Sequence, residues 1–180
     1  MKIIVLSIGQ VEYGILEYLK ENLTKIFSHV EFAVLEGFAN VPQEAYNNER
    51  KQYSSGFLFS FLRGYLEKSG ADKILGITTV DLYVPHLNFV FGGAELAGKL
   101  AIISLRRLRQ EFYGKPADQP VFLERTLKEA THEIGHTFGL THCSNSFCVM
   151  FFSNSILDVD RKYKNFCKEC SKCLRALSSQ

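Results

Sequence analysis

The sequence predicts an α+β fold in which helices pack against a mixed, twisted β-sheet. Residues 3–8 are almost all aliphatic and mostly β-branched, which is typical of a strand covered on both faces. Residues 11–28 then carry apolar side chains at helical spacing, and residues 31–38 are a second predicted strand. A strand–helix–strand unit of this kind places its two strands parallel. With 180 residues, 46% of them hydrophobic, the chain is long enough for a single domain with a sizeable core.

The rest of the chain continues this alternation. The predicted elements are, in order, a polar loop over residues 40–53, a helix from Ser54 or Ser55 to about residue 68, a strand over 73–80, a loop over 81–86, strands over 87–91 and 99–105, a short solvated helix over 106–113 and a long helix over 121–139. Gly92 and Gly93 are expected to end the strand over 87–91, which could pair with 99–105 as an antiparallel hairpin. On the long helix, Arg125 and Glu129 could orient other side chains of the same face, but an exposed ion pair between the two is favoured.

The long helix carries histidines in a pattern typical of a metal site. His132 and His136 are separated by one helical turn, about 40° around the axis and about 6 Å along it, so both imidazoles lie on one face. Glu133 stands beside them, where a carboxylate can reach a water molecule at the metal. Gly139 can adopt the left-handed conformation that ends a helix and so return His142 as a third ligand. Histidines placed by chance rarely come with both the glutamate and the glycine.

The cysteines predict a second metal site. All five follow residue 142, and Cys143 with Cys148 and Cys167 with Cys170 form two pairs that could supply a tetrahedral four-thiolate zinc site. Cys170 and Cys173 have the same spacing as Cys167 and Cys170, so the pattern alone leaves the second pair open; we favour Cys167 and Cys170, with Cys173 free. Basic residues nearby could offset the negative charge of four thiolates, namely Lys162, Lys164, Lys168, Lys172 and Arg175.

Composition excludes several classes of partner. The net charge is +2, from 21 Lys+Arg and 19 Asp+Glu, which gives no electrostatic case for nucleic-acid or membrane binding. No apolar run approaches the ~18 residues of a membrane span. The first apolar run is too short for a signal-peptide core and has no cleavage site after it. We therefore expect a cytoplasmic monomer that binds neither nucleic acid nor membrane.

With these residues in view, the chain resembles the metzincin metallopeptidases and, among them, the archaemetzincins of peptidase family M54. The resemblance is most specific over residues 131–170, whereas the first 120 residues fit the family in length and layout only. It is carried by the run from His132 through Glu133, His136 and Gly139 to His142 and Cys143, and then by Cys148, Met150, Cys167 and Cys170.

The resemblance implies a zinc metallopeptidase that hydrolyses a peptide or protein substrate with a zinc-activated water. It implies a catalytic zinc on His132, His136 and His142, with Glu133 as general base, and a structural zinc on Cys143, Cys148, Cys167 and Cys170. It also implies a sheet backed by one helix and by the active-site helix, with residues 1–139 as an N-terminal subdomain and residues 140–180 as a zinc-bound C-terminal subdomain. Met150 resembles the methionine beneath the zinc of metzincins, and residues 87–91 are the candidate edge strand for substrate.

Two other readings remain open at this point. The same ligands could hold zinc in a catalytically weak or inactive interaction module, which only activity measurements distinguish from an enzyme. An iron–sulfur site on Cys167, Cys170 and Cys173 is disfavoured because no fourth cysteine follows at the expected spacing. For the side chain that would stabilise the oxyanion, Arg125 and Tyr163 are the candidates.

Overall fold

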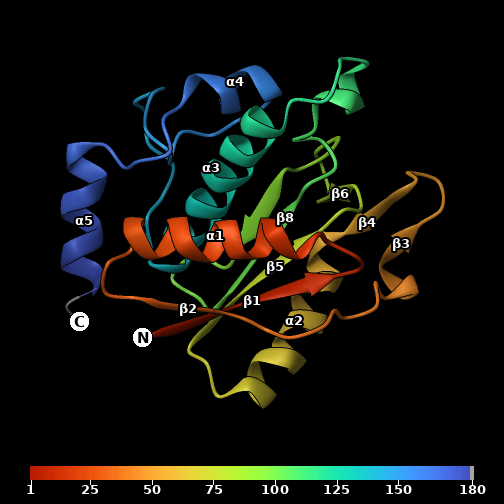
Figure 1. The fold of residues 1–180 in the computed structure, drawn as a ribbon, viewed down its shortest axis with the longest axis horizontal. Coiled ribbons are helices and arrows are strands. Elements are labelled where there is room, and N and C mark those ends of the chain that lie inside the picture. Colours follow the sequence, from red (N-terminus) through yellow and green to blue (C-terminus); the bar gives the residue numbers. More distant parts are fainter. Residues whose placement is uncertain (179–180) are drawn as a thin grey trace.

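The fold is organised around a five-stranded sheet in the order β2-β1-β5-β8-β7. The structure is a computed structural model that describes residues 1–178 (Figure 1). The strands are β1 (Lys2–Ile8), β2 (Glu31–Val34), β5 (Lys73–Thr78), β7 (Gly92–Ala94) and β8 (Leu100–Ser104). The first four strands in spatial order are parallel, and β7 runs antiparallel to β8 at the edge. The mixed sheet and the parallel β1–β2 pair are therefore confirmed.

Three long helices cover the two faces of this sheet. α1 (Tyr13–Ile26) and α3 (Gln119–Thr137) lie on one face, and α2 (Ser55–Ser69) lies on the other (Figure 1). The strands direct alternate side chains to the two layers: Ile3 and Val5 pack with α1 and α3, whereas Ile4 and Leu6 pack with α2. The sheet is thus buried on both sides, which explains its nearly continuous apolar sequence.

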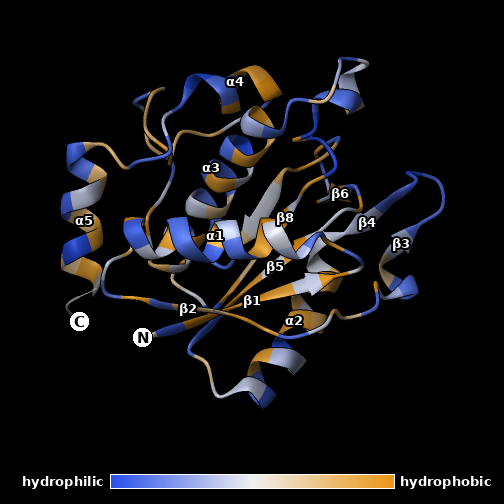
Figure 2. Cartoon of the chain, viewed as in Figure 1, coloured by the Kyte–Doolittle hydropathy of each residue, from blue (hydrophilic) through white to orange (hydrophobic). Residues whose placement is uncertain are grey.

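Smaller elements surround this core. A second sheet, in the order β3-β4-β6, consists of β3 (Tyr46–Asn47), β4 (Gln52–Ser54) and β6 (Leu82–Tyr83). Short 3₁₀ helices cover Gln43–Ala45 and Gln110–Tyr113, and the chain continues through α4 (Ile156–Arg161) and α5 (Lys168–Ser178). Figure 2 shows mainly hydrophilic residues on β3 and the turn that follows it, whereas the strands of the central sheet are mainly hydrophobic.

Several sequence-based boundaries are wrong. The polar stretch 40–53 contains a 3₁₀ turn and short strands, the second strand ends at Val34, and the active-site helix ends at Thr137. Residues 87–91 form no regular strand; the edge strand is Gly92–Ala94, where a strand end was predicted. Glycine is needed there because a Cβ on Gly92 would lie 2.7 Å from the carbonyl oxygen of Ile102. Within residues 1–178, no helix is long and apolar enough to cross a lipid bilayer.

Candidate active site

The helix that carries the histidines is fixed at both ends. Asp118 caps its start by accepting a hydrogen bond from the backbone N–H of Val121, and Pro120 occupies the first turn, where proline's missing N–H costs nothing. At its end, Gly139 has φ +93 and its N–H donates to the carbonyl of His136. The predicted left-handed turn at Gly139 is confirmed.

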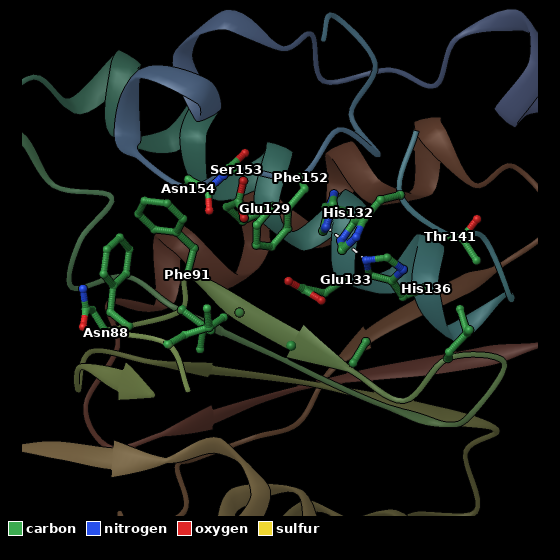
Figure 3. Close-up of a pocket in the computed structure, with 18 residues that line it drawn as sticks. Asn88, Phe91, Glu129, His132, Glu133, His136, Thr141, Phe152, Ser153 and Asn154 are labelled. Atoms are coloured by element: carbon green, nitrogen blue, oxygen red, sulfur yellow. Dashed lines mark hydrogen bonds between the residues drawn. The ribbon is translucent and has the colours of Figure 1, made fainter. Parts of the chain in front are cut away.

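Three imidazoles converge beyond this helix end. The ring centroids of His132 and His136 are 4.6 Å apart, and His142 lies 5.4 Å from the first and 4.8 Å from the second. One nitrogen of each ring lies within 4.8 Å of the others, close enough to share one ion. The structure therefore brings together the three histidines that the sequence singled out. Figure 3 labels two of them, His132 and His136.

Backbone carbonyls set the tautomers of the first two histidines. His132 Nδ1 lies 2.8 Å from the carbonyl oxygen of Val149, and His136 Nδ1 lies 2.7 Å from that of Leu140. Because a carbonyl oxygen only accepts, both Nδ1 atoms carry hydrogen, so both neutral rings direct an Nε2 lone pair into the site. These Nε2 atoms are 3.0 Å apart, where two lone pairs repel unless a cation lies between them. The donor set fits a zinc ion.

The charge state of the three imidazole rings also favours metal binding. Burial lowers the pKa of His132 well below its ordinary value, and the nearby Lys162 ammonium lowers it further. Burial likewise lowers the pKa values of His136 and His142. The rings are consequently neutral at physiological pH, which is the form that ligates metal.

Met150 packs directly beneath the ligand helix. It is fully buried, and its Sδ would lie only 2.6 Å from a Cβ on Gly135. A side chain at position 135 would thus displace the methionine. Gly135 stands between His132 and His136 in the sequence, so the sulfur approaches the backbone of the helix turn that carries both histidines.

Glu133 lies between the histidines and the edge strand. Burial raises the pKa of its carboxyl well above the ordinary value, and the Glu129 carboxylate raises it further, while Lys162 opposes both effects. A Cβ on Gly92 would come within 2.8 Å of both Cγ and Oε1 of Glu133. The edge strand can therefore pass this close to the carboxylate only because residue 92 has no side chain.

The four predicted cysteine ligands form a second cluster. The Sγ atoms of Cys143, Cys148, Cys167 and Cys170 lie within 4.8 Å of one another, and all five cysteines of the chain are free thiols. Burial raises the pKa values of Cys148 and Cys170, whereas the backbone N–H of Cys170 lowers the pKa of Cys167. Convergent thiols in this number are the donor set of structural zinc. Cys173 is exposed and is not part of the cluster.

Comparison with known proteins identifies the family of the chain that carries these two clusters. The sequence profile of peptidase family M54 matches residues 4–176. The chain belongs to peptidase family M54. The archaemetzincin of Methanocaldococcus jannaschii is 46% identical over 175 residues, which covers 97% of this chain and 93% of that protein.

Solved structures of the family agree with this fold. The crystal structure of an archaemetzincin from Methanopyrus kandleri matches with a TM-score of 0.88 at 39% identity, covering 100% of this chain and 96% of that one. The archaemetzincin of Archaeoglobus fulgidus, complexed with malonate, matches with a TM-score of 0.83 at 42% identity, covering 96% and 99%. This M54 chain is a zinc metallopeptidase, and its two ligand groups can hold two zinc ions.

A cleft of about 490 Å³ opens over the histidines of this M54 peptidase. One side is formed by residues 87–91, here called the cleft wall, together with β7. The opposite side is formed by Phe152, Ser153 and Asn154, and Glu133 and the histidines line the cleft between the two (Figure 3). Arg125 and Tyr163 do not line it, so neither can serve as the oxyanion partner from its position in this structure.

Sequence reasoning missed a buried ion pair beside the site. Glu129 was expected in an exposed pair with Arg125, but both residues are buried. Glu129 Oε1 lies 2.8 Å from Lys162 Nζ, and the side chains are 4% and 0% exposed. Arg125 instead forms two hydrogen bonds with the Asp160 carboxylate at 2.7 Å. Lys162 was expected to offset the charge of the thiolates, but its ammonium group pairs with Glu129 beside the histidines instead. In the sequence, Lys162 appears as one of several lysines in a cysteine-rich segment, which does not indicate a buried partner for Glu129.

Proposed function

We propose that His132, His136 and His142 hold the catalytic zinc of this M54 peptidase and that Glu133 is its general base. The convergence of three neutral imidazoles beside a buried carboxylate, on the surface of an open cleft, carries this proposal. Zinc bound there would act as a Lewis acid, lowering the pKa of water towards ~7 and stabilising developing negative charge.

Glu133 moves the proton in the proposed reaction. Its carboxylate accepts a proton from the water that attacks the scissile carbonyl and then delivers it to the departing amine. A carboxylate whose pKa is raised by burial holds that proton more firmly than an ordinary one, which suits a group that must first accept and then donate. The Nδ1–H contacts of His132 and His136 to carbonyl oxygens keep the rings fixed while this happens.

We infer that the substrate binds as an extended strand along β7, in place of the predicted strand over 87–91. The carbonyl oxygen of Phe91 accepts a hydrogen bond from the backbone N–H of Ser104, and the backbone N–H of Glu95 donates to the carbonyl oxygen of Leu100. The backbone groups of these two odd-numbered residues therefore face β8. Antiparallel geometry then turns the N–H and C=O groups of Gly92 and Ala94 away from β8. Backbone groups on such a free edge pair with an added peptide strand.

We also propose that Cys143, Cys148, Cys167 and Cys170 hold a structural zinc that folds residues 140–180 as a C-terminal subdomain against residues 1–139. Basic side chains near it, apart from Lys162, remain the proposed compensation for thiolate charge. A monomer working in the cytoplasm without nucleic-acid or membrane partners stays a prediction from composition.

The test is substitution of Glu133 in protein with a measured zinc content. Glu133→Gln should reduce turnover of a quenched-fluorescent peptide library by at least the ~10²–10⁴-fold expected for loss of a general base, while two zinc ions stay bound. The matched control is Glu124→Gln on the same helix, because Glu124 is 58% exposed and an amide can still accept from its partner Lys128. The control should retain full activity.

Two results would contradict the proposal. Turnover by Glu133→Gln at the wild-type rate in a preparation free of contaminating peptidase would remove Glu133 as base. No turnover by the wild-type, zinc-loaded protein on any library member would favour the zinc-binding interaction module instead.

A further inference from the structure

Four polar residues outside the cleft form one connected network behind the cleft wall. Asp81 is at its centre: Arg107 binds it through Nε at 2.6 Å and Nη2 at 2.7 Å, and Gln52 donates to it at 2.9 Å. Arg50 joins through its Nε, which donates to the Gln52 side-chain oxygen at 3.1 Å. The four residues come from the second sheet, from the turns beside it and from the segment after β8. We call them the buttress.

The buttress binds the backbone of the cleft wall directly. Arg50 Nη2 donates to the carbonyl oxygen of Leu87 at 2.6 Å and to that of Asn88 at 3.2 Å. Gln52 donates to the same Asn88 oxygen at 2.9 Å. Gln52 is 6% exposed, so its amide has little access to competing water. Two adjacent carbonyls of the wall are thus held by side chains that do not line the cleft.

Arg107 holds the wall by a different contact. Its guanidinium lies 4.1 Å from the ring centroid of Phe89, and that ring packs edge-on against Phe91 at 5.1 Å. Both phenylalanines line the cleft. Because Asp81 fixes the guanidinium at two atoms, the cation–π contact holds the ring in a set position. The buttress therefore reaches the side chains of the wall as well as its backbone.

Few backbone contacts hold the wall. Within the described residues, residues 87–91 form three backbone hydrogen bonds, from Leu87 N–H to Val84 at 3.3 Å, from Val90 N–H to Leu82 at 3.0 Å, and from Ser104 N–H to Phe91 at 2.7 Å. His86, just before the wall, has φ +74, a conformation that a non-glycine residue adopts only when its surroundings impose it. A segment held this sparsely depends on the side chains behind it for its position.

We propose that Arg50, Gln52, Asp81 and Arg107 are positioning residues that set peptide binding by fixing the cleft wall. The proposal rests on the proposed function, since it takes the cleft as the substrate site. Loss of the buttress weakens substrate binding and leaves proton transfer intact, because none of the four residues lines the cleft beside Glu133 or the histidines. Arg107 lies in the segment over 106–113, which the sequence predicts as a short solvated helix, but its contacts with Asp81 and Phe89 give it a role at the cleft wall.

The proposal is tested with Arg50→Met and Arg107→Met in the full, zinc-loaded chain. Methionine keeps an apolar stem but has no donors. The matched control is Arg109→Met, because Arg109 also forms an ion pair and a cation–π contact, but with Glu12 and Phe122. A quenched-fluorescent peptide that the wild-type protein cleaves gives kcat and KM, and hydrogen exchange reports the amides of Leu87 and Val90 without any substrate.

Arg50→Met and Arg107→Met should each raise KM about 5- to 10-fold with kcat within about 2-fold of wild type, which corresponds to roughly 1 kcal/mol of binding. The Leu87 and Val90 amides should exchange at least about 10-fold faster, while amides of α3 keep their protection. Arg50→Lys can still donate to a wall carbonyl and should recover part of the KM. Arg109→Met should change none of these quantities.

Unchanged exchange at Leu87 and Val90 in both variants would overturn the proposal, as would a fall in kcat at constant KM. If the wild-type protein cleaves no peptide, the proposed function fails, but the exchange experiment still decides whether the buttress positions the wall. The two failures are therefore distinguishable.

Discussion

The histidine cluster and the cysteine cluster meet at one peptide bond, between His142 and Cys143, yet different forces hold them in place. His132 and Glu133 lie on a helix packed into the main core, and carbonyl oxygens orient the rings. The cysteines share a small cluster of their own in which Leu140, Cys148, Val149 and Met150 are the buried members. Val159 of the same segment is buried in the main core, and Ile156, Phe166 and Leu174 pack against that core. These contacts and the small cluster together supply little of the free energy that orders so long a segment.

The comparison suggests an order of dependence. The main core would present His132, His136 and Glu133 even without metal, whereas residues after 142 would need their metal in order to fold. The imidazole of His142 lies in the histidine cluster, but its backbone is continuous with the cysteine segment. We therefore expect His142 to leave its position when the cysteine cluster loses its metal and the segment unfolds. Each prediction below tests one side of this comparison.

The largest effect is expected from Cys148→Ser. Cys148 is 1% exposed and its Sγ accepts the backbone N–H of Cys167, so serine removes a ligand from the centre of the cluster. We expect loss of one zinc equivalent, a loss of stability of at least ~3 kcal/mol and loss of peptidase activity. Zinc content and urea unfolding measure these effects. Cys173→Ser is the control, and loss of zinc from that variant would overturn the ligand assignment.

Lys162→Met should come next. It leaves the Glu129 carboxylate buried without its 2.8 Å partner, which typically costs ~3–5 kcal/mol. Removing both charges in Glu129→Gln with Lys162→Met should restore most of that stability, because no uncompensated charge then remains buried. Urea unfolding of the two single variants and the double variant forms a thermodynamic cycle. Additive losses would show that the pair is not coupled.

The metal-free protein should lose stability as the pH falls below about 6.5. Burial holds the pKa values of His132, His136 and His142 below the ordinary value of 6.5. Between those lowered values and 6.5 the unfolded chain binds more protons than the folded one, so the free energy of unfolding falls as the pH falls. Each histidine contributes a slope of up to ~1.4 kcal/mol per pH unit. Glu133, whose pKa is raised by burial, contributes a slope of the opposite sign above its ordinary value of 4.5, and the three histidines together outweigh it.

Chelator-treated protein unfolded in urea at several pH values measures this slope. His132→Gln should flatten it, whereas His29→Gln, at an exposed position, should leave it unchanged. A slope equal in all three proteins would contradict the assignment to the buried histidines.

The smallest effect on stability is expected from His142→Gln. His142 is the most exposed of the three histidines, and its ring lies 4.8 Å from the ring of Phe152 and beside its two partner histidines. We expect the metal-free variant to unfold within about 0.5 kcal/mol of wild type, although catalytic zinc and peptidase activity are lost. A large destabilisation of the metal-free protein would mean that His142 helps to fold the segment after the helix.

The sequence predicted the convergence of the three histidines because helical spacing and one glycine determine its geometry. His132 and His136 share a face on any helix, and Gly139 could only be a turn, so the histidine cluster followed from local rules. The parallel β1–β2 pair followed from the same kind of rule. Contacts made within a few residues along the chain are visible in the sequence.

What the sequence could not predict depends on contacts between distant segments. Glu129 and Lys162 come from different elements, and nothing local marks a lysine that will be fully buried. Residues 87–91 have the apolar character of a strand, but the carbonyls of Leu87 and Asn88 bind Arg50 and Gln52 instead of a neighbouring strand. Gly92 looked like a strand end because its partner in space, Glu133, follows much later in the chain.

The buried Lys162 has a consequence for the order in which the molecule matures. During synthesis, the sheet and α3 are complete before the segment that carries this lysine has emerged. Until then Glu133, whose pKa is raised by burial and by the Glu129 carboxylate, lacks the Lys162 ammonium that opposes both effects, so its carboxyl group favours protonation or solvent exposure over packing as an anion. The same late segment delivers His142. With His142 as the proposed third zinc ligand, catalysis has to wait until the last quarter of the chain has folded.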